Sequence, residues 1–186
     1  TRLPVDISIE DCEVVVDSCP VFDPRHHVKR KQYAYTIKYR RRQENDQYPE
    51  ELMGTHLMRR AFDSPILWVC PWTLDDSLLP NLCKNLQGKR DFSNFVHKED
   101  RERDSVLDIE MGFEFIETKT EHFEHNSVVA TSNVVTGRFV FQSARFRRTM
   151  LRLLVGYCVD VCRGRPGAPT IDQIFDQNVA QQIHAA

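Results

Sequence analysis

A strict alternation of residue types in residues 32–39 constrains the fold more than any other feature of this sequence. Tyr33, Tyr35, Ile37 and Tyr39 occupy every second position of this segment. Side chains of a β-strand point alternately to the two faces of a sheet, so these four share one face. The segment therefore predicts a strand with an apolar and aromatic face.

Other strands and loops are predicted from the same kind of pattern. Residues 106–116 and 137–144 are rich in β-branched, aromatic and aliphatic residues and predict two strands joined as a hairpin. The polar residues 117–136 between them predict a hairpin loop or insertion. Residues 40–64 are charged and weakly periodic, which predicts a second insertion or loop, and an early strand is predicted near residues 11–17.

Helices are predicted where apolar residues recur every three or four positions. Residues 73–87 predict a helix capped by Thr73, and a short helical turn is expected at residues 91–95. A final helix is expected to begin after Thr170. The strongest helix is predicted at residues 145–162, where one apolar stripe contains Phe146, Met150, Leu153, Leu154, Tyr157 and Val161.

These elements define the expected fold class. Strands joined partly by hairpins, with helices between them, predict an α+β fold in which helices pack on one face of a mainly antiparallel sheet. Residues 1–186 are long enough for a single domain with its own core. No apolar run approaches the roughly 20 residues that a membrane-spanning helix needs, so a membrane partner is not expected.

The six cysteines contain no Cys-x-x-Cys pair, which zinc ribbons and fingers require at close spacing. They are therefore interpreted as reduced thiols of an intracellular protein, several of them buried, and no metal is expected. Formal net charge is only −2, but the basic residues are segregated. They form two groups, one at residues 25–42 without any acid and one at residues 145–165, and such groups can make a positive face for nucleic acid.

Four segments in order carry a more specific signal, at residues 3–7, 22–35, 86–95 and 139–156. They read Leu-Pro-Val-Asp-Ile, then Phe-Asp-Pro-Arg followed by Arg-Lys-Gln-Tyr-Ala-Tyr, then Gly-Lys-Arg-Asp-Phe-Ser-Asn-Phe, and finally a stretch ending Phe-Arg-Arg-Thr-Met-Leu-Arg-Leu-Leu-Val-Gly. This set resembles the motifs of the TruA family of tRNA pseudouridine synthases. Arg90 replaces the family's usual histidine. The Asp-Phe-Ser-Asn-Phe segment is more typical of eukaryotic members of the family.

The resemblance implies the C-terminal half of a catalytic domain. Family members place the active site in a cleft between two similar halves, and this chain would supply one wall. The family's Arg-Thr-Asp segment, which carries the nucleophilic aspartate upstream, does not occur here, and neither does the final Pro-x-x-Gly-Leu-x-Leu strand. The chain is therefore expected to be a fragment that is inactive alone and needs the N-terminal half as its partner.

The resemblance also assigns two catalytic residues and requires no cofactor. Arg152 matches the arginine that pairs with the catalytic aspartate, a role that suits a bidentate guanidinium. Tyr33 matches the tyrosine that lies against the target uracil, where an aromatic ring offers a stacking face. The competing interpretations are a surface helix arginine for Arg152 and a core tyrosine for Tyr33, which would fit Tyr35 equally well.

The expected substrate is tRNA, modified in or near the anticodon arm. Phosphate contacts are expected from six basic residues: Arg25, Lys29, Arg30, Lys31, Arg147 and Arg148. Two alternatives are a non-catalytic RNA-binding module of the same fold and a plain interaction domain for an acidic partner. Loss of the partner half should expose apolar surface, so self-association as a homo-oligomer is also expected.

Overall fold

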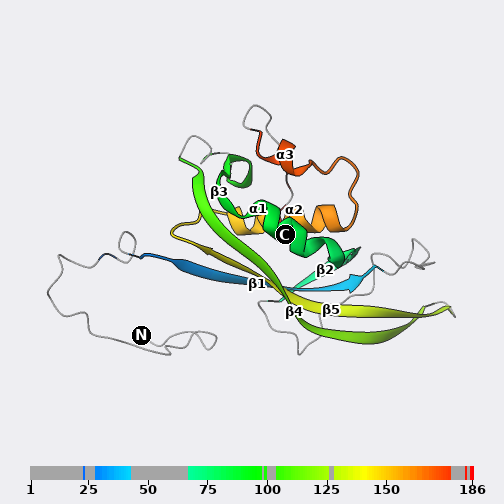
Figure 1. The fold of residues 1–186 in the computed structure, drawn as a ribbon. Coiled ribbons are helices and arrows are strands. Elements are labelled where there is room, and N and C mark those ends of the chain that lie inside the picture. Colours follow the sequence, from blue (N-terminus) through cyan, green and yellow to red (C-terminus); the bar gives the residue numbers. More distant parts are fainter. Residues whose placement is uncertain are drawn as a thin grey trace, which may run out of the picture.

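A five-stranded sheet with the strand order β2-β1-β5-β4-β3 forms the centre of the computed structural model (Figure 1). The strands are β1 (Lys31–Arg41), β2 (Trp68–Leu74), β3 (Gly88–Asp91), β4 (Val106–His125) and β5 (Val128–Ser143). Three α-helices lie over one face of the sheet: α1 (Leu79–Leu86), α2 (Met150–Cys162) and α3 (Ile171–Ile174). The structure describes residues 23, 28–42, 67–97, 99, 104–125, 128–176, 183, 185 and 186.

The predicted fold class is confirmed. Four of the strands pair antiparallel, and only β2 runs parallel to its neighbour β1. The alternating residues Tyr35, Ile37 and Tyr39 lie on the side of β1 that faces the helices. Ile37 and Tyr39 are fully buried there, and Tyr35 pairs with Phe139 on β5. No helix in the described part of the chain is long and apolar enough to cross a membrane.

Gly137 allows the aromatic side chains of this core to pack closely. It lies in β5 between Ile37 of β1 and Phe115 of β4. A Cβ atom at this position would come within 2.3 Å of the Phe113 ring. The absence of a side chain therefore lets Phe113 lie over the β5 backbone and pack edge-on against Phe139, with ring centroids 4.8 Å apart.

The prediction of a loop at residues 117–136 is wrong, because β4 and β5 continue through it as one long hairpin. The polar side chains there satisfy one another across the strands. Thr120 Oγ1 donates to Asn133 Oδ1 at 3.1 Å, and His122 Nδ1 lies 3.1 Å from Thr131 Oγ1. Such cross-strand pairs stabilise strands whose side chains are mostly polar, so the hydrophobic pattern does not reveal them.

The boundaries of the other predicted loop and of the early strand are only partly visible. Arg40 and Arg41, assigned to the loop at residues 40–64, belong to β1. The rest of that loop from residue 43 onward lies outside the described residues, as does the strand predicted near residues 11–17.

The helix predicted at residues 73–87 begins later, because a strand precedes it. Thr73 is part of β2 and is not the N-cap of the helix. A 3-10 turn, Asp76–Leu78, precedes α1, and its N-cap is Asp75. The Asp75 side chain accepts a hydrogen bond from the Ser77 backbone N–H. The α-helix α1 follows directly with Pro80 in its first turn. Proline lacks the N–H that a helix interior needs but is tolerated in the first turn, which fixes the start of α1 near this residue.

The strongest predicted helix also starts late. Residues 145–149 form the connection from β5, and α2 begins only at Met150. The other two helical predictions are confirmed. A 3-10 turn occupies Ser93–Phe95, and Thr170 begins α3 with a capping box in which Thr170 and Gln173 exchange side-chain-to-backbone hydrogen bonds.

The segment around Asp91 has a structural role. The Asp91 carboxylate accepts a hydrogen bond from the Ser93 backbone N–H at 2.8 Å, and Phe92 is fully buried. Arg90, which stands where the family has histidine, lies 4.7 Å from the centre of the Phe175 ring. These contacts hold α3 against the 3-10 turn at Ser93–Phe95, with Ile174 and Phe95 fully buried between them.

Asn94 provides the most specific of these contacts and a test of them. Its buried amide nitrogen donates to the carbonyl of Ile174 at 3.0 Å and to that of Asp176 at 3.4 Å. Asn94→Ala is expected to lower the free energy of unfolding by about 1–3 kcal/mol, since it leaves the buried carbonyl of Ile174 without this donor. Urea denaturation measures this, with Asn85→Ala on the exposed face of α1 as the control. Equal midpoints for the two variants would contradict the docking of α3.

Four cysteines lie in the core, as expected: Cys70, Cys83, Cys158 and Cys162 are buried and free. Burial raises the pKa of Cys70, Cys83 and Cys162 from 9.0 to about 12, so all three thiols are protonated at neutral pH. The folded state holds these protons more tightly than the unfolded chain. Their contribution to stability is therefore complete below pH 9 and is lost as the pH rises toward 12.

Thiol reactivity tests this placement. In a variant with Cys12→Ser and Cys19→Ser, dithionitrobenzoate at neutral pH is expected to react with the four core thiols only as fast as the protein unfolds. Urea above the unfolding midpoint should make all of them react at once. Rapid reaction of the native protein would mean that these thiols are accessible and that the core is not packed as described.

Candidate functional site

A groove of about 490 Å³ lies between the first half of β1 and the segment that leads into α2. Both predicted catalytic residues line it, from elements far apart in the sequence. Tyr33 comes from β1, and Arg152 comes from the first turn of α2. The side chains that give the groove its chemical character are Tyr33, Tyr35, Phe146, Arg147, Arg148 and Arg152.

Tyr33 is an open aromatic surface in this groove. Its side chain lies on the helix side of β1 but is 47% exposed, because the core begins only further along the strand. Phe146 supports it edge-on, with ring centroids 5.3 Å apart. A tyrosine fixed by one neighbour and open to solvent can offer a ring face to a planar base.

Tyr35 lines the same groove but is more buried than Tyr33. It is partly buried and packs edge-on against Trp68 at a centroid distance of 6.3 Å. Burial raises the pKa of Tyr35, and the nearby positive charge of Arg152 offsets part of this rise. The Tyr35 hydroxyl is therefore neutral and lies within the electrostatic range of the Arg152 guanidinium.

Arg152 presents an exposed guanidinium at the start of α2. Its backbone carbonyl accepts a hydrogen bond from the Ala186 N–H at 3.1 Å, while its side chain has no ion-pair partner within the part of the chain that the structure describes. No acidic residue lines the groove among the described residues. The positive end of the helix dipole adds to the guanidinium charge, so an anion is favoured here.

The predicted phosphate-binding residues lie in different parts of the structure. Arg147 and Arg148 line the groove, and Arg147 donates from Nη2 to the Asp104 carbonyl. Lys29 and Arg30 line a second groove. Lys31 is in β1 and lines neither groove, and Arg25 lies outside the described residues.

Thr149 is strained at the edge of the groove. Its φ angle of 61° places it in the left-handed region, and among the described residues it alone does so without being glycine. A left-handed residue with a side chain costs roughly 1–2 kcal/mol. Strain of this kind persists where the surroundings fix the backbone, and here it directs the chain from Phe146 into α2.

Three residues of the site escaped prediction from sequence. Phe146 was assigned to the apolar stripe of a helix, but it precedes α2 and supports Tyr33. Thr149 carries no pattern that reveals a left-handed backbone. Tyr35 shared the alternation of Tyr33, which could have indicated that both rings face the same groove.

The chain resembles bacterial proteins named tRNA pseudouridine synthase A. The protein of Thermodesulfovibrio yellowstonii is 28% identical over 176 residues, which is 94% of this chain and 59% of the relative. That of Exiguobacterium sibiricum is 28% identical over 183 residues, covering 97% of this chain and 59% of the relative. That of Methylobacterium radiotolerans is 34% identical over 92 residues, 50% of this chain and 29% of the relative.

No family model matches the chain. The chain spans 59% of the length of the two relatives that it matches almost throughout. The matches cover the strands and helices that form the groove, and the observed mixed sheet with helices on one face agrees with half of a pseudouridine synthase domain. Over almost its whole length the chain is therefore similar to bacterial proteins named tRNA pseudouridine synthase A, in agreement with the resemblance of its motifs to the TruA family.

Proposed function

We propose that this chain forms one wall of the uridine site of a tRNA pseudouridine synthase. The reaction breaks the N1–C1′ bond of a uridine, turns the detached uracil and joins C5 to C1′. The uracil must be held while it is free, and a carboxylate must act beside C1′. No electrons are gained or lost, so the chemistry needs no redox cofactor.

The observation that carries the proposal is the shared groove of Tyr33 and Arg152. The exposed ring of Tyr33 suits a turning base, because stacking tolerates rotation in the plane of the ring. The guanidinium of Arg152 suits a carboxylate, which it binds through two parallel hydrogen bonds and keeps ionised. These two roles predict that the carboxylate lies close to Arg152.

The carboxylate itself is proposed to come from a segment outside these 186 residues. Family members carry it in an Arg-Thr-Asp segment, which this sequence does not contain. The absence of an acid among the described residues of the groove agrees with such a source. This chain alone is accordingly proposed to be inactive.

The RNA is proposed to be tRNA, held in or near its anticodon arm. Arg147 and Arg148 flank the uridine position and suit its neighbouring phosphates, while Arg25 and Lys31 stay candidates for more distant ones. The chain is also proposed to self-associate through exposed apolar residues such as Phe115 and Ile116.

The test compares pseudouridine formation on a pool of tRNA transcripts by two proteins. One is the present chain, and the other is the same chain joined to an upstream segment that contains Arg-Thr-Asp. Activity of the longer protein only is the expected result. If both are inactive while RNA binding is retained, the chain is a non-catalytic RNA-binding module instead. If neither binds RNA, an interaction domain for an acidic protein becomes the better explanation.

A further inference from the structure

Tyr35 differs from the two structural tyrosines of the core. Tyr39 is fully buried and donates its hydroxyl hydrogen to Asp76 at 2.8 Å. Tyr157 is buried as well and donates to the backbone carbonyl of Pro169 at 3.0 Å. Tyr35 is only partly buried, and its hydroxyl makes no hydrogen bond with another residue that the structure describes. Because Tyr35 lines the same groove as Tyr33, this hydroxyl can bind a group that enters there.

The ring of Tyr35 is held from two neighbouring strands. Trp68 of β2 packs edge-on against it, with ring centroids 6.3 Å apart. Phe139 of β5 is its cross-strand partner on the other side, and neither neighbour carries a charge. Tyr33 and Tyr35 are two positions apart in β1, so both side chains lie on the same face of the sheet. The packing therefore fixes the Tyr35 ring before any partner arrives.

The charged group nearest in effect to this hydroxyl is the guanidinium of Arg152. Its positive charge offsets part of the rise that burial causes in the pKa of Tyr35. Such an interaction weakens with distance, so the phenol and the guanidinium lie near each other in the groove. Three other titratable side chains line the groove, and no acid does among the described residues: Tyr33, Arg147 and Arg148.

The two neighbouring groups need the same kind of partner. A guanidinium only donates hydrogen bonds, so Arg152 cannot accept the hydrogen of the neutral Tyr35 hydroxyl. An anion placed beside both can accept from both. An ionised carboxylate has two oxygens with about four lone-pair sites, and a bidentate arginine occupies two of them. A carboxylate paired with Arg152 therefore keeps room for a third donor, which Tyr35 is placed to provide.

We propose that Tyr35 is a positioning residue for the catalytic carboxylate, to which its hydroxyl donates a hydrogen bond beside the pair made by Arg152. The carboxylate is then held by donors from two rigid elements, β1 and α2, which together fix the oxygen that faces C1′. A hydrogen bond to the ionised form also lowers the pKa of that carboxyl group. This inference rests on the proposed function, because the carboxylate comes from the upstream segment.

The pH dependence of Tyr35→Phe provides the test, in the chain joined to an upstream segment that contains Arg-Thr-Asp. Phenylalanine keeps the ring against Trp68 and removes only the hydroxyl. Losing a donor to the ionised carboxylate raises its pKa, so activity should be lost at a higher pH on acidification. The acidic limb of the single-turnover rate at saturating protein, measured from about pH 4 to pH 8, is expected to move up by about one unit. The Kd for tRNA should stay unchanged.

Tyr157→Phe is the matched control, because it also removes one tyrosine hydroxyl but Tyr157 does not line the groove. Its acidic limb should coincide with that of the unsubstituted protein, since a loss of stability alone does not change the pKa of the carboxyl group. If Tyr35→Phe is active with an unmoved limb, the inference fails and the proposed function stands. Weaker tRNA binding with an unmoved limb would make Tyr35 an RNA contact instead. If the unsubstituted longer protein is inactive, both proposals fail.

Discussion

Replacing Arg152 by alanine, in a protein that also carries the Arg-Thr-Asp segment, is expected to lower kcat for pseudouridine formation by about 10²- to 10³-fold. The reason is that a carboxylate beside C1′ would lose its cationic partner, a change worth roughly 3–4 kcal/mol in a desolvated site. Arg152→Lys should recover only part of the activity, since an ammonium keeps the charge but cannot bind the carboxylate through two parallel bonds.

The neighbouring Arg148 provides the matched control, because it is also exposed and lines the same groove. As a phosphate contact, Arg148→Ala should raise Kd and lower the salt slope by about one, with kcat little changed. Single-turnover rates on tRNA transcripts at saturating protein separate the two effects. If Arg152→Ala altered Kd and the salt slope but not kcat, Arg152 would be a phosphate contact and its proposed pairing with the aspartate would be wrong.

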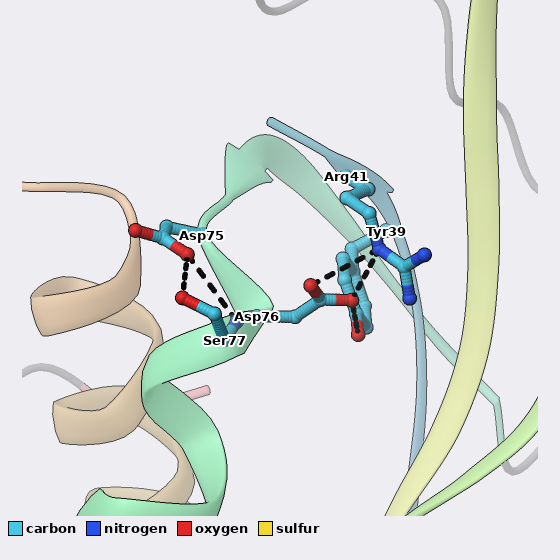
Figure 2. A network of polar contacts seen from close by, with 5 residues as sticks. All are labelled: Tyr39, Arg41, Asp75, Asp76 and Ser77. Atoms are coloured by element: carbon cyan, nitrogen blue, oxygen red, sulfur yellow. Dashed lines mark hydrogen bonds and ion pairs between the residues drawn. The ribbon is translucent and has the colours of Figure 1, made fainter. Parts of the chain in front are cut away.

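Replacing Asp76 by alanine is expected to cause a large loss of stability. Figure 2 shows its side chain directed at two residues of β1. Asp76 is buried and accepts a 2.8 Å hydrogen bond from the fully buried Tyr39 hydroxyl. It also accepts hydrogen bonds from Arg41 Nε at 2.8 and 3.0 Å. The change should lower the free energy of unfolding by about 2–4 kcal/mol.

This range lies below that of a fully buried ion pair, because the Arg41 side chain is 35% exposed and can be hydrated. The main cost is then the Tyr39 hydroxyl left without an acceptor. Tyr39→Phe removes that hydroxyl, so the double variant should be less destabilised than the sum of the single ones. Urea denaturation of all four proteins measures this coupling, and strict additivity would contradict the shared network.

The sequence predicts a helix or strand well where the buried side chains recur with the period of that element or where a capping residue marks its start. The alternation of tyrosines and isoleucine located β1, and the Thr170 capping box located α3. The motif positions of Tyr33 and Arg152 indicated two residues that the fold brings to one groove. These predictions depended on local patterns or on spacing within a known motif, both of which the sequence states directly.

The remainder depended on contacts that sequence does not state. β2 was missed because it is short, contains Pro71 and pairs with β1 through a register shift. The second groove joins residues before β1 to the ends of β4 and β5, a combination that only the fold produces. Among the basic residues, sequence could not separate Arg147 and Arg148, which line the groove of Tyr33, from Lys29 and Arg30, which line the second groove. Nearness along the chain is not nearness in space.

The long hairpin of β4 and β5 has unequal support along its length. Near Ile109 the strand β4 lies between β3 and β5, and β5 is flanked by β1 as far as Val134. Beyond these points, at Thr120 and Asn133, the two strands pair only with each other among the described strands. Two-stranded ribbons are marginally stable in water. One continuous strand thus spans two cooperative units: its base opens only with the whole domain, whereas its far part can open alone.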